Sequence, residues 1–357
     1  MGSRRSSLHS RPPPTLFMLI AVVVVALIAA AADGFAPRVP CYFIFGDSLF
    51  DNGNNNNLST VTKVNYSPYG VDFPAGPTGR FSNGRTTADL IGEMLGFRKF
   101  IPPFASNPDE RQILVGVNYA SGSAGILFES GKLGGDNIDL DQQLKNHEVT
   151  VSRIAQILGS KQAAGEHLGQ CLYICNMGNN DYLNNYILPQ STEIRNRYNP
   201  DQFAAHLITQ YSAQINRMYK LGARKVALAG VSNIGCTPRL IAAVGTDDGA
   251  TCVESANQVV APFNTRLRSL VSQLNSVYHD AKFAYLDSVL VGTLALKEFR
   301  ITRKTCCQVS TVTGLCLPNT RPCTFRRSHL FWDAYHPTDF ANRLGAPIYY
   351  PAIQRIL

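Results

Sequence analysis

The sequence lacks features that are typical of several classes of protein, and each absence disfavours one class. Lysine and arginine are scattered, without a long basic run, which disfavours nucleic-acid binding. No two cysteines have the C-x-x-C spacing of paired zinc ligands, which favours disulfides over a structural metal. No linker divides the chain, so its length fits one large domain.

A long uncharged run lies only near the N-terminus, where three arginines precede a stretch from Leu16 to Ala32 that ends in alanines. This order is typical of a secretory signal peptide. We therefore predict that residues 1–32 are a signal peptide and that residues 33–357 form a single domain. A transmembrane anchor is the alternative, which is disfavoured because no basic cluster follows the run directly.

The charge of the predicted mature chain is modest. Without the three N-terminal arginines, 30 lysine and arginine residues stand against 25 aspartate and glutamate residues, a net charge of about +5. This charge supports no more than weak attraction to acidic cell-wall polymers or lipid surfaces. Two sequons, at Asn57 and Asn65, are candidate N-glycosylation sites in a secreted chain.

Nine cysteines fit the oxidising compartment that a signal peptide implies. Cys236 and Cys252 flank a loop rich in Gly and Asp, and we expect them to pair. Cys171 and Cys175 have even spacing on a predicted strand, so they share a face and are expected to be buried thiols. Four more cysteines crowd one segment, which predicts one or two disulfides of open connectivity: Cys306, Cys307, Cys316 and Cys323.

Short, continuous apolar runs alternate with helical patterns along the chain. Apolar residues recur at helical spacing from Phe203 to Tyr219 and from Phe263 to Leu274. Five apolar runs are typical of strands buried on both faces of a parallel sheet: Cys41 to Phe45, Ile113 to Tyr119, Leu172 to Asn176, Val226 to Ala229, and Phe283 to Leu286. The alternation predicts an α/β fold with three α/β/α layers and a central, mostly parallel five-stranded sheet.

Three residues at opposite ends of the chain suggest nucleophilic catalysis. Ser48 follows the first predicted strand, and Asp333 lies three residues before His336. A hydroxyl is a good nucleophile when a base removes its proton, and an imidazole is a good base when a carboxylate fixes its tautomer. We therefore predict a catalytic triad of Ser48, Asp333 and His336. Ser48 is not part of a G-x-S-x-G elbow, which argues against the α/β-hydrolase fold, and neighbouring Asp47 is expected to bind loop amides instead of acting as the base.

Four sequence blocks carry a resemblance to a known family. They are Gly46-Asp-Ser-Leu49, Asn118-Tyr-Ala-Ser-Gly-Ser-Ala-Gly125, Gly178-Asn-Asn-Asp181 and Asp333-x-x-His336. In this order they resemble the GDSL esterase/lipase family of the SGNH hydrolase superfamily, from about Tyr42 to about Tyr350. Gly235-Cys-Thr-Pro238 makes the chain most similar to the plant-type secreted branch.

The resemblance implies a flavodoxin-like SGNH hydrolase fold that works without a cofactor or metal. It also implies an oxyanion hole made by the backbone N–H groups of Ser48 and Gly122 and by the side-chain amide of Asn180. Gly125 and Asn179 are the alternatives for the second and third donors. At Ser123 the chain departs from the family pattern, which frequently has glycine there.

The expected function is a secreted, extracellular ester hydrolase that works through an acyl-enzyme on lipid-like or cell-wall acyl esters. The resemblance places such an enzyme in the cell wall or apoplast. An acyltransferase that uses the same triad on a polyol or hydroxy-acyl acceptor is one alternative. A catalytically silent secreted binding protein with the same fold is the other, because fold alone does not determine function.

Overall fold

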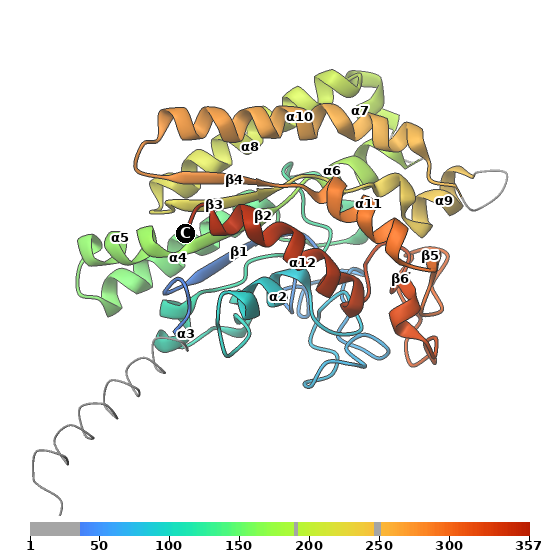
Figure 1. The fold of residues 1–357 in the computed structure, drawn as a ribbon, viewed down its shortest axis with the longest axis horizontal. Coiled ribbons are helices and arrows are strands. Elements are labelled where there is room, and N and C mark those ends of the chain that lie inside the picture. Colours follow the sequence, from blue (N-terminus) through green and yellow to red (C-terminus); the bar gives the residue numbers. More distant parts are fainter. Residues whose placement is uncertain (1–35, 189–191, 246–250) are drawn as a thin grey trace, which may run out of the picture. The chain divides into compact units, whose positions relative to one another are not determined.

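The chain folds around a parallel sheet, as a computed structural model that describes residues 36–188, 192–245 and 251–357 shows (Figure 1). In the main sheet the strand order is β1-β2-β3-β4, and each strand runs parallel to its neighbour. The strands are β1 (Tyr42–Gly46), β2 (Leu172–Asn176), β3 (Lys225–Ala229) and β4 (Lys282–Leu286). The register pairs Gly46 with Asn176 and Asn176 with Ala229, so the carboxyl ends of the strands lie level.

Helices cover both faces of this sheet, which confirms the predicted three-layer α/β/α arrangement (Figure 1). The helices of the described residues are α2 (Thr87–Met94), α3 (Glu110–Val115), α4 (Leu140–Ile157), α5 (Lys161–Gln170), α6 (Asn179–Tyr182), α7 (Thr192–Arg197), α8 (Pro200–Lys220), α9 (Pro238–Val244), α10 (Glu254–Val277), α11 (Ser288–Glu298) and α12 (Asp339–Gln354). Phe43 and Phe45 of β1 share a core with α4, α8 and α10. Tyr42 and Ile44 point to the other face and share a core with α2 and α12. Both faces of β1 are therefore buried, which explains its continuous apolar run.

The predicted strand from Ile113 to Tyr119 is wrong, and in the described part of the chain the main sheet has four strands instead of five. Residues Glu110–Val115 form α3, because the Asp109 side chain accepts a hydrogen bond from the Gln112 amide in a capping box. The chain beyond α3 runs beside β1 as an irregular segment, joined to that strand by an isolated bridge between Ile44 and Asn118 and by a hydrogen bond from the Ser121 amide to the carbonyl oxygen of Gly46 at 3.0 Å. The capping box at the start of α3 thus favours a helix over residues 113–115, although the apolar run there favours a strand.

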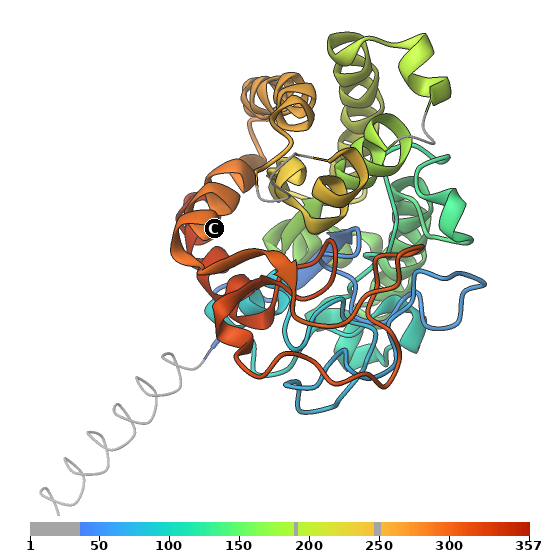
Figure 2. The same cartoon turned by 90° about the vertical axis from the view of Figure 1, so that its right-hand side faces the viewer.

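A smaller two-stranded sheet lies in the C-terminal part of the chain. Its strands are β5 (Ile301–Thr305) and β6 (His329–Phe331). Figure 2 shows this part, in red and orange, at the end of the molecule towards which the carboxyl ends of the main strands point. The irregular segment between β5 and β6 carries two disulfides, Cys306–Cys323 and Cys307–Cys316, which confirms the prediction of one or two bridges. The predicted pair Cys236–Cys252 is also a disulfide.

The expectation for Cys171 is wrong, because this residue forms a disulfide with Cys41. Tyr42 and Leu172 are partners at the amino ends of β1 and β2, so the residues that precede them lie side by side, with 4.7 Å between their Cα atoms. Cys175 is a buried free thiol, as predicted.

The predicted signal peptide, residues 1–32, lies outside the described residues and stays a prediction. Residues 39–357 form one compact unit. In the described ranges, no helix combines the length and the apolar character that crossing a bilayer requires.

Candidate active site

Ser48 lies in the first turn after β1, at the carboxyl edge of the sheet. The turn closes because the amides of Phe50 and Asp51 donate to the carbonyl oxygen of Asp47, at 3.1 and 3.0 Å. The carboxylate of Asp47 accepts a hydrogen bond from the Leu49 amide at 2.9 Å, which confirms the expectation that it binds loop amides. The turn holds the half-buried Ser48 side chain where the segments after β1 and β2 meet.

The structure brings Ser48, His336 and Asp333 together from the two ends of the chain. Ser48 Oγ lies 2.8 Å from His336 Nε2. His336 Nδ1 lies 2.8 Å from each carboxylate oxygen of Asp333. Because a carboxylate accepts hydrogen bonds, Nδ1 carries the proton and Nε2 can accept the proton of the Ser48 hydroxyl. This arrangement can convert Ser48 into a nucleophile.

Asp333 is fully buried and is held by hydrogen bonds from several directions. Its Oδ1 atom accepts the backbone N–H groups of Tyr335 and His336, at 2.9 and 2.8 Å. Its Oδ2 atom accepts the hydroxyl of Tyr69 at 2.6 Å. Sequence reasoning missed Tyr69, because it lies in an irregular segment without a recognisable motif.

A second buried carboxylate, Asp47, joins the ends of β1 and β2. Its Oδ2 atom accepts a hydrogen bond from Asn179 Nδ2 at 2.9 Å, and its Oδ1 atom accepts one from Asn176 Nδ2 at 3.3 Å. Burial raises the pKa of Asp47 to about 6, although the hydrogen bonds from Asn179 and from the Leu49 amide lower it in part. The side-chain amide of Asn179 is therefore engaged with Asp47, and this contact helps to join the ends of β1 and β2.

Asn180 and the Ser48 amide are both placed as candidates for the oxyanion roles predicted for them. Asn180 lines the cavity beside Ser48. Its Nδ2 atom donates one hydrogen to the carbonyl oxygen of Ala124 at 2.9 Å, while its Oδ1 atom accepts a hydrogen bond from Asn184 at 2.9 Å. A carboxamide has two N–H hydrogens, so the second remains available to a ligand. Within the described residues, the Ser48 N–H donates to no protein acceptor.

Gly122 is placed differently from the sequence-based expectation. Its N–H donates to Asp51 Oδ2 at 2.9 Å, so this donor is already engaged with a buried carboxylate. The other candidate, Gly125, packs tightly against Ser130 and Asp181. Ser123 lies between these glycines and lines the cavity, and its φ of 65° is unusual for a residue with a side chain. No acceptor for the Ser123 N–H exists among the residues that the structure describes.

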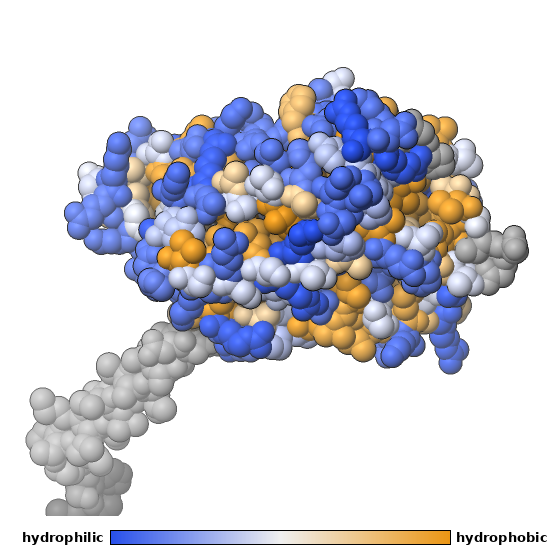
Figure 3. Space-filling view, turned by 90° about the horizontal axis from the view of Figure 1, so that it is seen from above, coloured by the Kyte–Doolittle hydropathy of each residue, from blue (hydrophilic) through white to orange (hydrophobic). Residues whose placement is uncertain are grey.

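A cavity of about 340 Å³ opens beside Ser48 and His336. Part of its wall is apolar and comes from the turn after β1 and from residues on and near α9, α11 and β6: Leu49, Ile234, Val291, Leu296, Leu330 and Phe331. Apolar residues also line its mouth, where Leu133 is 78% and Val312 is 80% exposed. In the space-filling view of Figure 3, apolar surface gathers towards the end of the molecule at which α9 and α11 lie. The site therefore joins a polar catalytic edge to an apolar pocket.

Possible metal ligands gather at three places in the described residues, and each group contains a disulfide. The groups are Cys41, His167 and Cys171; Cys306, Cys323 and His329; and Cys236, Cys252 and Glu254. Sulfurs joined to one another do not act as thiolate ligands. These groups are best explained as disulfides with polar neighbours.

Comparisons with known proteins agree with the geometry of the site. The profile of the family described as GDSL-like lipase/acylhydrolase matches residues 42–346. The Arabidopsis thaliana protein GDSL esterase/lipase At1g29670 is 47% identical over 312 residues, which cover 85% of each chain. GDSL esterase/lipase At1g29660 of the same plant is 46% identical over 313 residues, which cover 86% of this chain and 85% of that protein. A solved α/β hydrolase, LAE5 from the metagenome of Lake Arreo, covers 89% of this chain and 98% of its own with a TM-score of 0.42 at 11% identity, values too low to support an argument.

A parallel α/β sheet with a Ser–His–Asp arrangement at its carboxyl edge is typical of serine hydrolases. Because its family profile spans most of the chain, the protein belongs to the GDSL family of lipases and acylhydrolases. It is accordingly a carboxylic ester hydrolase.

Proposed function

We propose that the protein is a secreted serine esterase that hydrolyses lipid-like acyl esters through an acyl-enzyme. The observation that carries this proposal is the continuous chain of 2.8 Å contacts from Ser48 through His336 to Asp333. Such a chain lets one imidazole move a proton in both halves of a two-step reaction. The same geometry counts against a catalytically silent binding protein, in which nothing would require the hydroxyl, the imidazole and the carboxylate to be aligned.

In the first step, Ser48 Oγ attacks the acyl carbon and its proton passes to His336 Nε2. The tetrahedral intermediate then collapses, the bond to the alcohol breaks, and His336 returns the proton to the leaving alkoxide. In the second step, a water molecule loses a proton to His336 and attacks the acyl-enzyme, which releases the acid and restores the Ser48 hydroxyl. Throughout, Asp333 stabilises the imidazolium that forms and holds its ring in place.

The developing negative charge of each tetrahedral intermediate needs donors that are already in position. We assign the Ser48 N–H and the second hydrogen of Asn180 Nδ2 to this role, as the sequence predicts. For the remaining donor we assign the N–H of Ser123 in place of Gly122. Ser123 lines the cavity with a free N–H, whereas the Gly122 N–H is bound to Asp51.

The cavity supports an ester whose acyl part is apolar. Its apolar wall removes hydrocarbon surface from water, which stabilises binding by about 25 cal/mol per Å² of buried surface. The exposed Leu133 and Val312 at the mouth extend the same surface outward. An acyl chain can therefore lie along the apolar wall while its carbonyl group reaches Ser48.

Secretion is supported by features outside the site. Four disulfides are typical of a protein that folds in an oxidising compartment. The candidate glycosylation residues Asn57 and Asn65 are both exposed, as attachment of a glycan requires. With the predicted signal peptide at residues 1–32, these features support an extracellular enzyme, and acyl esters of the cell wall remain a candidate substrate there.

The proposal is tested by comparing Ser48→Ala with a matched control. Ser232 lines the same cavity but lies outside the triad, so Ser232→Ala removes an equivalent hydroxyl from the pocket. We expect Ser48→Ala to abolish hydrolysis of acyl esters, and Ser232→Ala to retain most of it. Ester turnover by Ser48→Ala at an appreciable fraction of the unmodified rate would refute the nucleophile assignment. Supplying an alcohol acceptor and analysing the products separates hydrolysis from acyl transfer.

A further inference from the structure

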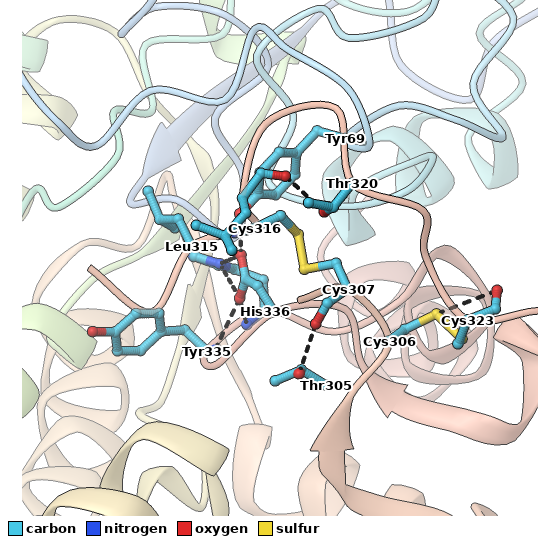
Figure 4. Close-up of a disulfide and its surroundings, with 12 residues drawn as sticks. Tyr69, Thr305, Cys306, Cys307, Leu315, Cys316, Thr320, Cys323, Tyr335 and His336 are labelled. Carbon is cyan, nitrogen blue, oxygen red and sulfur yellow. Dashed lines mark hydrogen bonds and ion pairs between the residues drawn. A yellow bond between two sulfur atoms is a disulfide. The ribbon is translucent and has the colours of Figure 1, made fainter. Parts of the chain in front are cut away.

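Tyr69 makes a contact with the triad that the reaction described above does not use. Its hydroxyl donates to Asp333 Oδ2 at 2.6 Å, and both residues are almost completely buried. The same hydroxyl accepts a hydrogen bond from the Cys316 amide at 3.1 Å (Figure 4). The amide fixes the orientation of the phenol, so that its single proton points at the carboxylate.

The Tyr69 hydroxyl stays protonated and acts as a donor. Burial raises the pKa of Tyr69 well above its usual value, and the negative charge of Asp333 raises it further. Within the described residues, Asp333 has no lysine or arginine as an ion-pair partner. The side chains that donate to it are those of His336 and Tyr69, in addition to two backbone amides. Tyr69 therefore disperses part of a buried charge that no cation neutralises.

The segment between Cys307 and Cys316 ties Tyr69 to the chain on both sides of Asp333. Before Asp333, the carbonyl oxygen of Trp332 accepts the Cys307 amide at 3.0 Å. After it, the Ala334 amide donates to the carbonyl oxygen of Gly314 at 3.0 Å. The disulfide Cys307–Cys316 closes this segment. The Cys316 amide, which orients the Tyr69 hydroxyl, is therefore held in place relative to the backbone that carries the Asp333 carboxylate.

We propose that Tyr69 is a positioning residue, which holds the Asp333 carboxylate in the plane that orients His336, and that the Cys307–Cys316 loop holds Tyr69 in place. The proposal rests on the triad of the proposed function. His336 Nδ1 is equally far from both carboxylate oxygens, so the ring alone does not select one orientation of the carboxylate. Backbone amides fix Oδ1, and Tyr69 fixes Oδ2.

The test compares Tyr69→Phe with Tyr66→Phe in the full-length secreted protein. Tyr66 packs against Tyr69, and its hydroxyl donates to the carbonyl oxygen of the same Cys316 at 2.9 Å, but it does not bond to Asp333. The control therefore removes one hydroxyl beside Tyr69 and leaves every hydrogen bond to the Asp333 carboxylate in place. For each variant, kcat and KM for a short-chain ester are measured across pH, together with the melting temperature.

We expect Tyr69→Phe to lower kcat about tenfold with little change in KM, because the Asp333 carboxylate is then no longer held in the plane that orients His336. The size of this loss is on the scale of one hydrogen bond to a charged group. Without the phenol, Asp333 carries a less dispersed charge and stabilises the imidazolium more strongly. The acidic limb of the pH profile of kcat/KM should therefore move to higher pH, by about half a unit. Tyr66→Phe should keep both the kcat and the pH profile of the unmodified protein.

Two results would overturn the proposal. One is a Tyr69→Phe protein with unchanged kcat and pH profile. The other is an equal loss of kcat in both variants with no movement of the profile, which would assign the effect to loop packing. If Tyr69→Phe does not fold, the paired change Cys307→Ala and Cys316→Ala is compared with Cys306→Ala and Cys323→Ala, and the pH profile should move in the first pair alone. Failure of the triad itself is distinguishable, because Ser48→Ala would then still hydrolyse esters.

Discussion

Replacing Asn180 by alanine separates a role in the transition state from a role in the fold. The side chain bonds to Ala124 and Asn184, so the substitution removes two structural hydrogen bonds as well as the proposed oxyanion donor. Loss of one oxyanion donor lowers kcat by about 10²- to 10³-fold. Leaving the buried Ala124 carbonyl without its donor costs about 1–3 kcal/mol of the free energy of unfolding. We therefore expect a large fall in kcat, a nearly constant KM and a melting temperature lower by several degrees.

Asn184→Ala is the matched control for this prediction. It removes the hydrogen bond to Asn180 Oδ1 but leaves the Asn180 amide hydrogens in place. The assay measures kcat, KM and thermal unfolding on the same preparation of each protein, so that activity is expressed per folded molecule. Equal kcat values for Asn180→Ala and Asn184→Ala would refute the oxyanion role, as would a rise in KM at constant kcat.

Further predictions concern pH, the disulfides and the substrate. The pKa of Asp47 is about 6 in the native state and 3.8 in the unfolded chain. Between these pH values the native state keeps a proton that the unfolded state has released, so the free energy of unfolding falls as the pH rises. The unmodified protein should lose about 2 kcal/mol of unfolding free energy relative to Asp47→Asn as the pH rises from 4 to 6, measured by urea titration. Cys41→Ala with Cys171→Ala should cost about 2–5 kcal/mol of stability without changing kcat, because this bridge lies at the opposite end of β1 from Ser48. Leu133→Asp should raise KM for long-chain esters about tenfold and leave short-chain esters unaffected, since it adds a charge at the cavity mouth.

Much of the fold and the centre of the site could be predicted from the sequence because the signals are local. Strand β1 is a continuous apolar run, and Ser48 follows it directly. Asp333 and His336 are close enough in sequence for one turn to join their side chains, so their contact did not depend on the rest of the fold. The level carboxyl ends of the strands then bring Ser48 to the same edge.

The parts that were missed depend on contacts between distant segments. Cys41 and Cys171 pair because β1 and β2 are neighbours in register, which no spacing along the chain reveals. Asp51 engages the Gly122 amide from a different loop, so the glycine motif alone could not show which N–H is free. Tyr69 reaches Asp333 across 264 positions of the sequence from a segment without periodicity.

The central claim is that Ser48 carries the acyl group during turnover. The most direct test incubates the protein with a slowly hydrolysed ester, quenches the reaction in acid and maps the acyl adduct by mass spectrometry of the peptides. The account predicts one acyl group per chain, attached to Ser48, in the unmodified protein and none in Ser48→Ala. An adduct on another residue, or ester turnover that leaves Ser48 unmodified throughout, would contradict it.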